Sequence, residues 1–203
     1  MPKGVLVIIS APSGTGKSTI CRKLLQRRKD LRYSTSCTTR APRPGEKHAK
    51  HYFFLGKDEF KRKIQRAEFL EWAVVHDNYY GTPRSYIESA LKAGTSVLLA
   101  IDIQGAAAIR RKMPESILIF ITPPTMESLR ERLTARKDAC ESVAKRLANS
   151  RAEMAAAKNY DYLVVNDDLE TAVSEISCIL TAEGLNVSRQ GLVELAPVLA
   201  HVN

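Results

Sequence analysis

The sequence predicts an α/β fold, in which a parallel sheet is flanked by helices. Four apolar runs recur along the 203 residues, at 5–9, 97–101, 117–121 and 162–165. None of these runs alternates polar with apolar residues, which is expected of strands that are covered on both faces. Segments with helical periodicity separate most of the runs, and such an alternation indicates parallel strands joined by right-handed crossovers.

Three helices are expected from their position and their apolar spacing. Residues 104–112 follow the second run, Pro123 and Pro124 open the next helix, and residues 169–183 follow the last run. Proline suits the first turn of a helix because its missing N–H group would be unpaired there in any case. The apolar stripes consist of Met126, Leu129 and Leu133 in the second helix, and of Leu169, Val173, Ile176 and Leu180 in the third.

Two stretches interrupt this alternation and divide the chain. Residues 34–83 are polar, aromatic and rich in turn residues, and they are too long for a loop, so we expect an inserted subdomain. Residues 125–158 are expected to form a helical lid, whose second part is rich in arginine, lysine and alanine. The core then consists of residues 1–33, 84–124 and 159–185, and a weakly amphipathic tail at 186–203 has no assigned role.

The composition is that of a globular protein with anionic partners. Apolar residues make up 44% and charged residues 26% of the chain, and 31 basic against 22 acidic residues give a net charge of +9. Such an excess suits either a nucleic acid or the phosphates of small molecules. No segment approaches the length of a membrane span, and the first apolar run is too short for a signal peptide. The four cysteines are scattered, so we expect reduced thiols in a cytoplasmic protein.

The most specific local motif is SAPSGTGKST at residues 10–19, directly after the first apolar run. A strand that runs into a small-residue loop ending in Gly-Lys-Ser is a P-loop, in which backbone N–H groups close around phosphate oxygens. Lys17 is expected to reach the β- and γ-phosphates of ATP, and the Ser18 hydroxyl is expected to bind Mg²⁺. The helix that starts near Lys17 directs its positive end at the same anion. The ATP-binding residues expected in this loop are Ser13, Gly14, Thr15, Gly16, Lys17, Ser18 and Thr19.

Further motifs follow in and beyond the inserted stretch. They are SCTTRAPRPGE at 36–46, HYFF at 51–54, FLEWA at 69–73, NYYGT at 78–82, IDIQG at 101–105 and VVNDD at 164–168. In order and spacing, this set resembles the guanylate kinases. The resemblance implies a P-loop NTPase-type parallel sheet with an inserted GMP-binding subdomain and a helical lid, and it implies ATP and GMP as the substrates.

A compact pair of arginines marks the expected phosphate site of the acceptor. Arg40 and Arg43 stand three residues apart beside a proline-rich turn, and their planar guanidinium groups suit a phosphate monoester. A nucleic-acid site more often repeats basic residues along one face, with aromatic residues for stacking. By resemblance, the phosphate of GMP is held by Arg40, Arg43, Ser36, Tyr52 and Tyr80.

Two carboxylates and a hydroxyl form the set that a guanine base requires. Guanine presents N1–H and N2–H donors beside its O6 acceptor, and Glu71, Asp102 and Thr82 match the positions that read the base in guanylate kinases. Taken singly, Glu71 is more often a surface carboxylate, and Asp102 is more often a cap at the end of a strand. Adenine would present an acceptor to a carboxylate and leave buried polar groups unpaired, at about 1–3 kcal/mol each.

The expected catalysis is positioning with charge neutralisation. The acceptor is a phosphate whose second pKa of about 6 leaves it mostly dianionic at neutral pH, so no general base is needed. Lys17 and Mg²⁺ act on the donor side, and Arg40 and Arg43 act on the acceptor side. The resemblance adds Arg132, Arg136 and Arg146, which match lid arginines that close over the ATP phosphates, and Asn166, which matches a residue near the adenine.

Two positions depart from the family pattern. Guanylate kinases usually carry an acidic residue two positions before the equivalent of Asp102, and here this residue is Ala100. Metal binding is therefore expected to depend more on Ser18, Asp102 and ATP itself. The lid turn at 135–141 lacks the usual Gly-Arg-Gly sequence and is one residue shorter than in the family. The resemblance therefore supports the role of Arg136 less strongly than that of Lys17.

The sequence thus predicts a Mg²⁺-dependent guanylate kinase that acts on GMP and dGMP, with no membrane or nucleic-acid partner. Tolerance of the deoxy substrate is expected because no residue is evidently reserved for a 2′-hydroxyl. Two alternatives stay open at this point. One is a guanylate-kinase-like module that binds proteins and has lost catalysis, for which a degraded P-loop is expected. The other is a basic P-loop protein that acts on nucleic acid, for which binding should fall steeply with salt.

Overall fold

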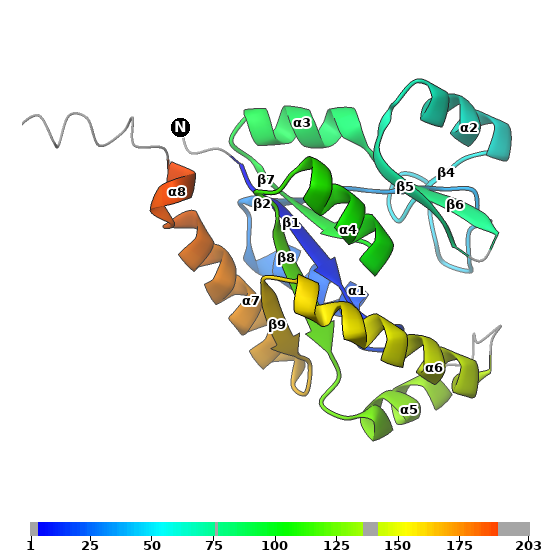
Figure 1. Ribbon diagram of the computed structural model, residues 1–203, viewed down its shortest axis with the longest axis vertical. Helices are drawn as coiled ribbons and strands as arrows, with labels where there is room; N and C mark the ends of the chain where they lie inside the picture. Colours follow the sequence, from blue (N-terminus) through cyan, green and yellow to red (C-terminus); the bar gives the residue numbers. More distant parts are fainter. Residues whose placement is uncertain (1–3, 76, 136–141, 191–203) are drawn as a thin grey trace, which may run out of the picture.

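The computed structural model describes residues 4–75, 77–135 and 142–190 (Figure 1). At its centre lies a parallel sheet with the strand order β2-β7-β1-β8-β9. Its strands are β1 (Leu6–Ser10), β2 (Leu31–Tyr33), β7 (Ser96–Ala100), β8 (Ile117–Thr122) and β9 (Tyr162–Val165). The α/β class and the parallel sheet predicted from the sequence are therefore confirmed.

The strand predictions need two corrections. Strand β2 was not expected, because three residues with Arg32 in the middle give no apolar run. Strand β9 was expected to be covered on both faces, and this is wrong for one of them. Val164 is buried, but the side chains of Leu163 and Val165 are 60% and 46% exposed. Since β9 is an edge strand of the sheet, its outer face lacks the second helical layer that covers β1.

Helices cover the two faces of the sheet through separate apolar clusters. Helices α1 (Lys17–Arg27) and α7 (Leu169–Gly184) pack on the face that carries Val7 and Ile9, whereas α3 (Arg84–Lys92) and α4 (Ile103–Lys112) pack on the face that carries Leu6 and Ile8. Each of these fully buried side chains contributes about 1.5–3 kcal/mol relative to an exposed one. The helices expected at 104–112 and 169–183 are confirmed as α4 and α7, and α8 (Val187–Gln190) follows α7.

The residues between β2 and α3 form a second, smaller sheet with the order β4-β3-β6-β5. Its elements are β3 (Cys37–Thr38), β4 (Phe53–Phe54), α2 (Lys57–Gln65), β5 (Phe69–Val75) and β6 (Asn78–Pro83). Phe60 of α2 is fully buried and stacks on Phe69 of β5, with ring centroids 4.4 Å apart. This aromatic contact fixes α2 on the sheet and gives the insert an apolar cluster of its own.

The stretch expected to be a lid contains α5 (Met126–Thr134), α6 (Val143–Met154) and the short 3₁₀ helix η1 (Ala155–Asn159). The expectation that this helix begins at the two prolines is wrong, because α5 begins at Met126. Its N-cap is Thr125, whose side chain accepts a hydrogen bond from the backbone of Ser128 in a reciprocal capping box. Arg136 lies outside the described residues, as does the part of the tail beyond Gln190. Among the helices that the structure describes, none combines the length and the apolar character that a membrane span requires.

Candidate active site

The loop between β1 and α1 has the geometry of a phosphate-binding loop. Gly14 and Gly16 have φ angles of 92° and 90°, a left-handed conformation that other residues adopt only with strain. A Cβ atom on Gly16 would lie 2.7 Å from Nδ2 of Asn166, so the site has no room for a side chain. The loop is closed on itself by the Thr15 hydroxyl, which donates to the carbonyl of Pro12 at 2.7 Å.

Helix α1 begins at Lys17, and its first N–H groups remain available to an anion. Gly16 is the N-cap and offers no side-chain hydrogen bond to them, so the partial positive charge of the helix end is directed at the loop. The Lys17 ammonium donates to the carbonyl of Ile101, just beyond β7, at 3.1 Å. Burial lowers the pKa of Lys17, and the negative potential of Asp102 and Glu153 is among the effects that oppose this.

Lys17 lines a cavity of about 170 Å³ that lies between the core and the inserted sheet. The expected acceptor residues Ser36, Tyr52, Tyr80 and Glu71 line it from the insert, and Asp102 lines it from the core. Five expected residues from separate parts of the chain therefore meet the P-loop lysine in one cavity.

The carboxylate of Glu71 is buried in the wall of this cavity. Glu71 is only 6% exposed, and the hydroxyl of Thr82 donates a short hydrogen bond to Oε1 of Glu71. The pKa of Glu71 is raised to about 7, chiefly by burial and also by the nearby Asp102, while the Thr82 hydrogen bond and the charge of Lys112 oppose the shift. Glu71 is thus not the ordinary surface carboxylate that its residue type alone suggests.

Asp102 performs the capping role and also borders the cavity. Its Oδ1 accepts hydrogen bonds from the N–H groups of Gln104 and Gly105, both at 2.8 Å, which makes it the N-cap of α4. Ala100 lines the same cavity, so the position that is usually acidic in the family does face this site.

The two expected phosphate-binding arginines differ in their placement. Arg40 donates to Glu46 Oε1 at 3.0 Å and to the carbonyl of Ala41 at 2.6 Å, and its guanidinium carbon lies 5.6 Å from the centre of the Tyr52 ring. Arg43 is exposed and is not among the residues that line the cavity. Neither arginine lines the cavity, but Arg40 lies against Tyr52, which does line it, whereas Arg43 is exposed.

Comparison with known proteins agrees with this arrangement. The family model described as guanylate kinase matches residues 3–183. The chain belongs to the guanylate kinase family. The guanylate kinase of Symbiobacterium thermophilum is 46% identical over 199 residues, which cover 98% of this chain and 94% of that protein. The guanylate kinase of Escherichia coli strain K12 is 51% identical over 193 residues, with 94% and 93% covered. The crystal structure of guanylate kinase from Anaplasma phagocytophilum matches with a TM-score of 0.82 at 39% identity, over 96% of this chain and 94% of that one.

In this guanylate kinase two of the three arginines expected in the lid, Arg132 and Arg146, lie in the described residues, and neither lines the cavity. Arg132 and Arg146 lie on α5 and α6 and are partly buried. Helix α5 does contact the P-loop, because a Cβ on Gly14 would lie 2.9 Å from Leu133 and 3.1 Å from Leu129. The helix that carries Arg132 is thereby anchored next to the loop that is expected to hold ATP.

Asn166, which the family resemblance places near the adenine, contacts the P-loop of this guanylate kinase. Its residue is 6% exposed, and its Nδ2 donates to the carbonyl of Thr15 at 2.6 Å. The Asn166 side chain therefore fixes the backbone of the loop at Thr15, between Gly14 and Gly16.

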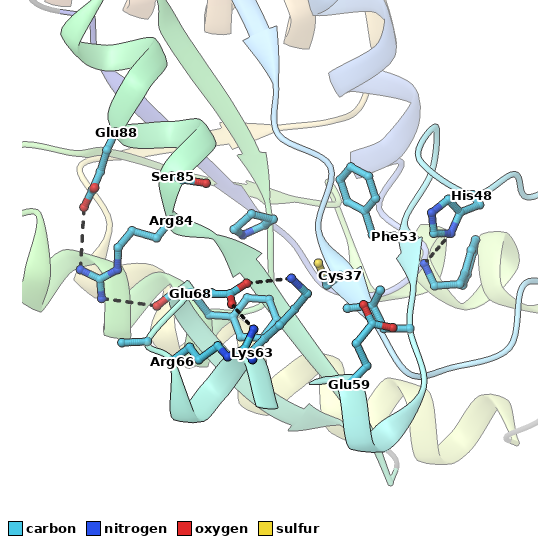
Figure 2. A pocket seen from close by; sticks show the side chains of 15 residues that line it. Cys37, His48, Phe53, Glu59, Lys63, Arg66, Glu68, Arg84, Ser85 and Glu88 are labelled. Atoms are coloured by element: carbon cyan, nitrogen blue, oxygen red, sulfur yellow. Dashed lines mark hydrogen bonds and ion pairs between the residues drawn. The ribbon is translucent and has the colours of Figure 1, made fainter. Parts of the chain in front are cut away.

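A larger cavity, of about 720 Å³, adjoins the inserted sheet and contains none of the expected site residues (Figure 2). Cys37 and Phe53 line it, whereas their chain neighbours Ser36 and Tyr52 line the smaller cavity. Figure 2 shows that charged side chains around it pair with each other, as Lys63 does with Glu68. The size of a cavity alone would therefore have directed attention to a surface that carries none of the expected site residues.

Sequence reasoning did not single out three residues that belong to the site. Glu46 holds Arg40, Glu153 of α6 lies within electrostatic range of Lys17 and Asp102, and Gly105 contacts both carboxylates of the cavity. A partial signal existed for Glu46, since it follows two arginines in the same turn. The contacts of Glu153 with Lys17 and Asp102, and of Gly105 with Glu71, join elements that are remote in sequence, so no local pattern indicates them.

Proposed function

We propose that this guanylate kinase binds ATP on the P-loop and GMP in the adjoining cavity, and that it transfers the γ-phosphate of ATP to GMP to give ADP and GDP. The observation that supports these sites most is the shared cavity, in which Lys17 of the P-loop meets Glu71 of the insert. A lysine suited to phosphate and a carboxylate suited to guanine in one cavity would bring the donor and acceptor phosphates next to each other. The intact P-loop geometry is what a catalytic member of the family requires.

On the acceptor side, hydroxyl groups and arginines would hold the phosphate of GMP. Ser36, Tyr52 and Tyr80 offer neutral donors inside the cavity, while Arg40 lies next to Tyr52 and supplies charge, with Arg43 further out. Glu71 and Asp102 would accept the N–H groups of guanine. Thr82 has a single hydroxyl hydrogen and gives it to Glu71, so we assign it the orientation of that carboxylate rather than a contact with O6.

The reaction then needs positioning and neutralisation of charge, with no general base. Lys17 would bind the phosphates of ATP together with the N–H groups of the P-loop and the start of α1, and Arg40 would neutralise the acceptor phosphate. Arg132, Arg136 and Arg146 remain predicted ligands of the ATP phosphates, brought in by movement of the lid over the cavity.

The residues present fit a Mg²⁺ ion that is held mainly by ATP. Among the described residues, no cluster of three or more His, Cys, Asp or Glu side chains forms a metal cage. Mg²⁺ in kinase sites typically takes one or two protein ligands beside phosphates and waters, and the exposed Ser18 in the first turn of α1 suits that role. When bound, the ion neutralises charge on the β- and γ-phosphates. With Ala100 in place of an acid, Asp102 is the carboxylate at the end of β7 that faces the same cavity.

Several finer assignments stay predictions. They are the division of the chain into core, GMP-binding insert and lid, the acceptance of dGMP, the absence of a nucleic-acid partner and the cytoplasmic location.

The proposed base site predicts the substrate preference. In a coupled assay with ATP, we expect kcat/KM for GMP and dGMP to exceed that for AMP, CMP and UMP by at least about 10³-fold, because a site built for N–H donors leaves buried groups unpaired with other bases. A comparable kcat/KM for AMP and GMP would contradict the assignment of Glu71 and Asp102. Binding of the protein to RNA that falls steeply with salt and ignores GMP would favour the nucleic-acid alternative instead.

The placement of Arg40 predicts the effect of a charge-conserving substitution. Arg40→Lys is expected to raise KM for GMP by about 10-fold and to leave KM for ATP unchanged, because an ammonium cannot form the two-pronged contact of a guanidinium with phosphate. The lysine can still pair with Glu46, so the fold should be kept. Arg66→Lys in the same insert is the matched control, since Arg66 is exposed and lies at the larger cavity. An unchanged KM for GMP in Arg40→Lys would show that Arg40 does not bind the acceptor phosphate.

A further inference from the structure

Gly105 lies in the first turn of α4, in contact with the Glu71 carboxylate. A Cβ atom built on Gly105 would lie 3.1 Å from Oε2 of Glu71 and 3.3 Å from its Cδ. The same Cβ would lie 3.3 Å from Cδ1 of Ile101. These distances are tighter than ordinary van der Waals contacts, so a methyl group at this position would require the Glu71 carboxylate or the helix to shift by a few tenths of an ångström.

The backbone does not explain this glycine. Gly105 is absent from the residues with positive φ and sits in regular helix, where alanine is normally preferred by about 0.5–1 kcal/mol. Gly14 and Gly16 of the P-loop differ from Gly105, because their positive φ angles require the conformational freedom of glycine. At Gly105 the reason for glycine is steric, because the carboxylate of Glu71 lies next to the space that a side chain would take.

Gly105 contacts both carboxylates that are expected to read the base. Its N–H group donates to Oδ1 of Asp102 at 2.8 Å, and its Cα faces Oε2 of Glu71. The other oxygen of Glu71, Oε1, accepts from Thr82. The Glu71 carboxylate is therefore held between a hydroxyl of the insert on one side and the bare first turn of α4 on the other.

We propose that Gly105 is a positioning residue for guanine recognition, whose missing side chain sets the place of the Glu71 carboxylate while its N–H group fixes Asp102. The proposal rests on the function proposed for Glu71 as a reader of guanine. It assigns part of the base specificity to the core helix α4, although most of the acceptor residues belong to the insert.

The first experiment replaces Gly105 by alanine. We expect KM for GMP to rise about 10-fold, while kcat at saturating GMP and KM for ATP stay within about twofold, because only acceptor binding depends on the carboxylate. The preference for GMP over IMP, which lacks the N2 amine, should shrink as well. Gly56→Ala is the matched control, since the same methyl group there has nothing within 4 Å and Gly56 has an ordinary φ of −69°. Unchanged GMP kinetics in Gly105→Ala would overturn the proposal.

A double-mutant cycle with Glu71→Ala separates this role from a general structural one. In the Glu71→Ala background the contact with the carboxylate is gone and only the contact with the end of the Ile101 side chain remains, so Gly105→Ala should change KM for GMP by less than about twofold. If Gly105→Ala lowers Tm, that loss should also disappear in the double variant. A persistent 10-fold change in KM or a persistent loss of Tm would mean that the methyl group collides elsewhere, and it would overturn the proposal. Glu71→Ala alone tests the underlying function, because an unchanged KM for GMP in that variant would refute the role of Glu71 itself.

Discussion

Replacement of Lys17 by alanine is expected to lower kcat by about 10³-fold, in line with the loss of a charged group that stabilises a transition state. Lys17 stands where the uncapped start of α1, the P-loop and the carbonyl of Ile101 meet. Its charge matters most while the γ-phosphoryl group transfers, so the loss should fall on kcat more than on KM for ATP. The protein should keep its fold, because only one side-chain hydrogen bond, worth about 1 kcal/mol, is lost.

The measurement is a steady-state assay at saturating ATP and GMP, with Tm recorded for each variant. Lys23→Ala is the control, because Lys23 lies on the same helix and pairs with Glu170 at the surface. Its kcat should stay within about twofold of the parent protein, since an exposed ion pair contributes little. A Lys17→Ala variant that kept a tenth or more of the parent kcat would contradict the proposed donor site.

GMP affinity is expected to rise with pH up to about 7 and then to level off. In the free protein, burial raises the pKa of Glu71 to about 7, so the group is largely protonated below that pH. Guanine offers N–H donors, which favour the ionised carboxylate and lower its pKa in the complex. Binding below pH 7 therefore releases a proton, and affinity increases by at most tenfold per pH unit in this window. The second pKa of the GMP phosphate, at about 6, adds a smaller pH dependence that fades between pH 6 and 7 and that is the same for every variant.

Calorimetry in two buffers with different ionisation enthalpies counts the protons released at pH 6.5. The control is Glu71→Gln, which keeps the size of the side chain and cannot ionise. We expect this variant to bind GMP about 100-fold more weakly, because hydrogen bonds to a charged acceptor are lost, and to keep only the small slope due to the phosphate between pH 6 and 7. An equal slope in both proteins would mean that Glu71 stays ionised when the site is empty, contrary to the pKa described above.

The parts of the fold that could be predicted are those with strong local signals. Four of the five core strands and the helices α4 and α7 appear as continuous apolar runs or helical stripes. The P-loop carries its own glycine and lysine pattern. Strand β2 and the strands β3 and β4 are only two or three residues long, and their pairing depends on partners far along the chain. Such strands are determined by tertiary contacts and leave little trace in the sequence.

The site was predictable as a set of residues and less so as a geometry. Lys17 shares one cavity with four residues that the motifs assign to the acceptor, Ser36, Tyr52, Tyr80 and Glu71. The sequence could not indicate that the Thr82 hydroxyl donates its hydrogen bond to Glu71, since this bond joins the two strands β5 and β6. It also gave no hint that the pKa of Glu71 is raised, because burial is a property of the folded surroundings and not of the residue.

The path of the chain through the inserted sheet has a consequence for how such enzymes diversify. The chain leaves the core after Tyr33, where the N–H group of Ser34 still bonds to Leu98 at 3.0 Å, and it returns at Arg84. The central sheet takes no strand from the segment between these points. With the sites proposed above, we expect that this segment could be exchanged to change the acceptor while the core that carries the P-loop is retained. The contact of Gly105 with Glu71 sets the condition for such a graft, because a new insert succeeds only if its base-reading side chain matches the first turn of α4.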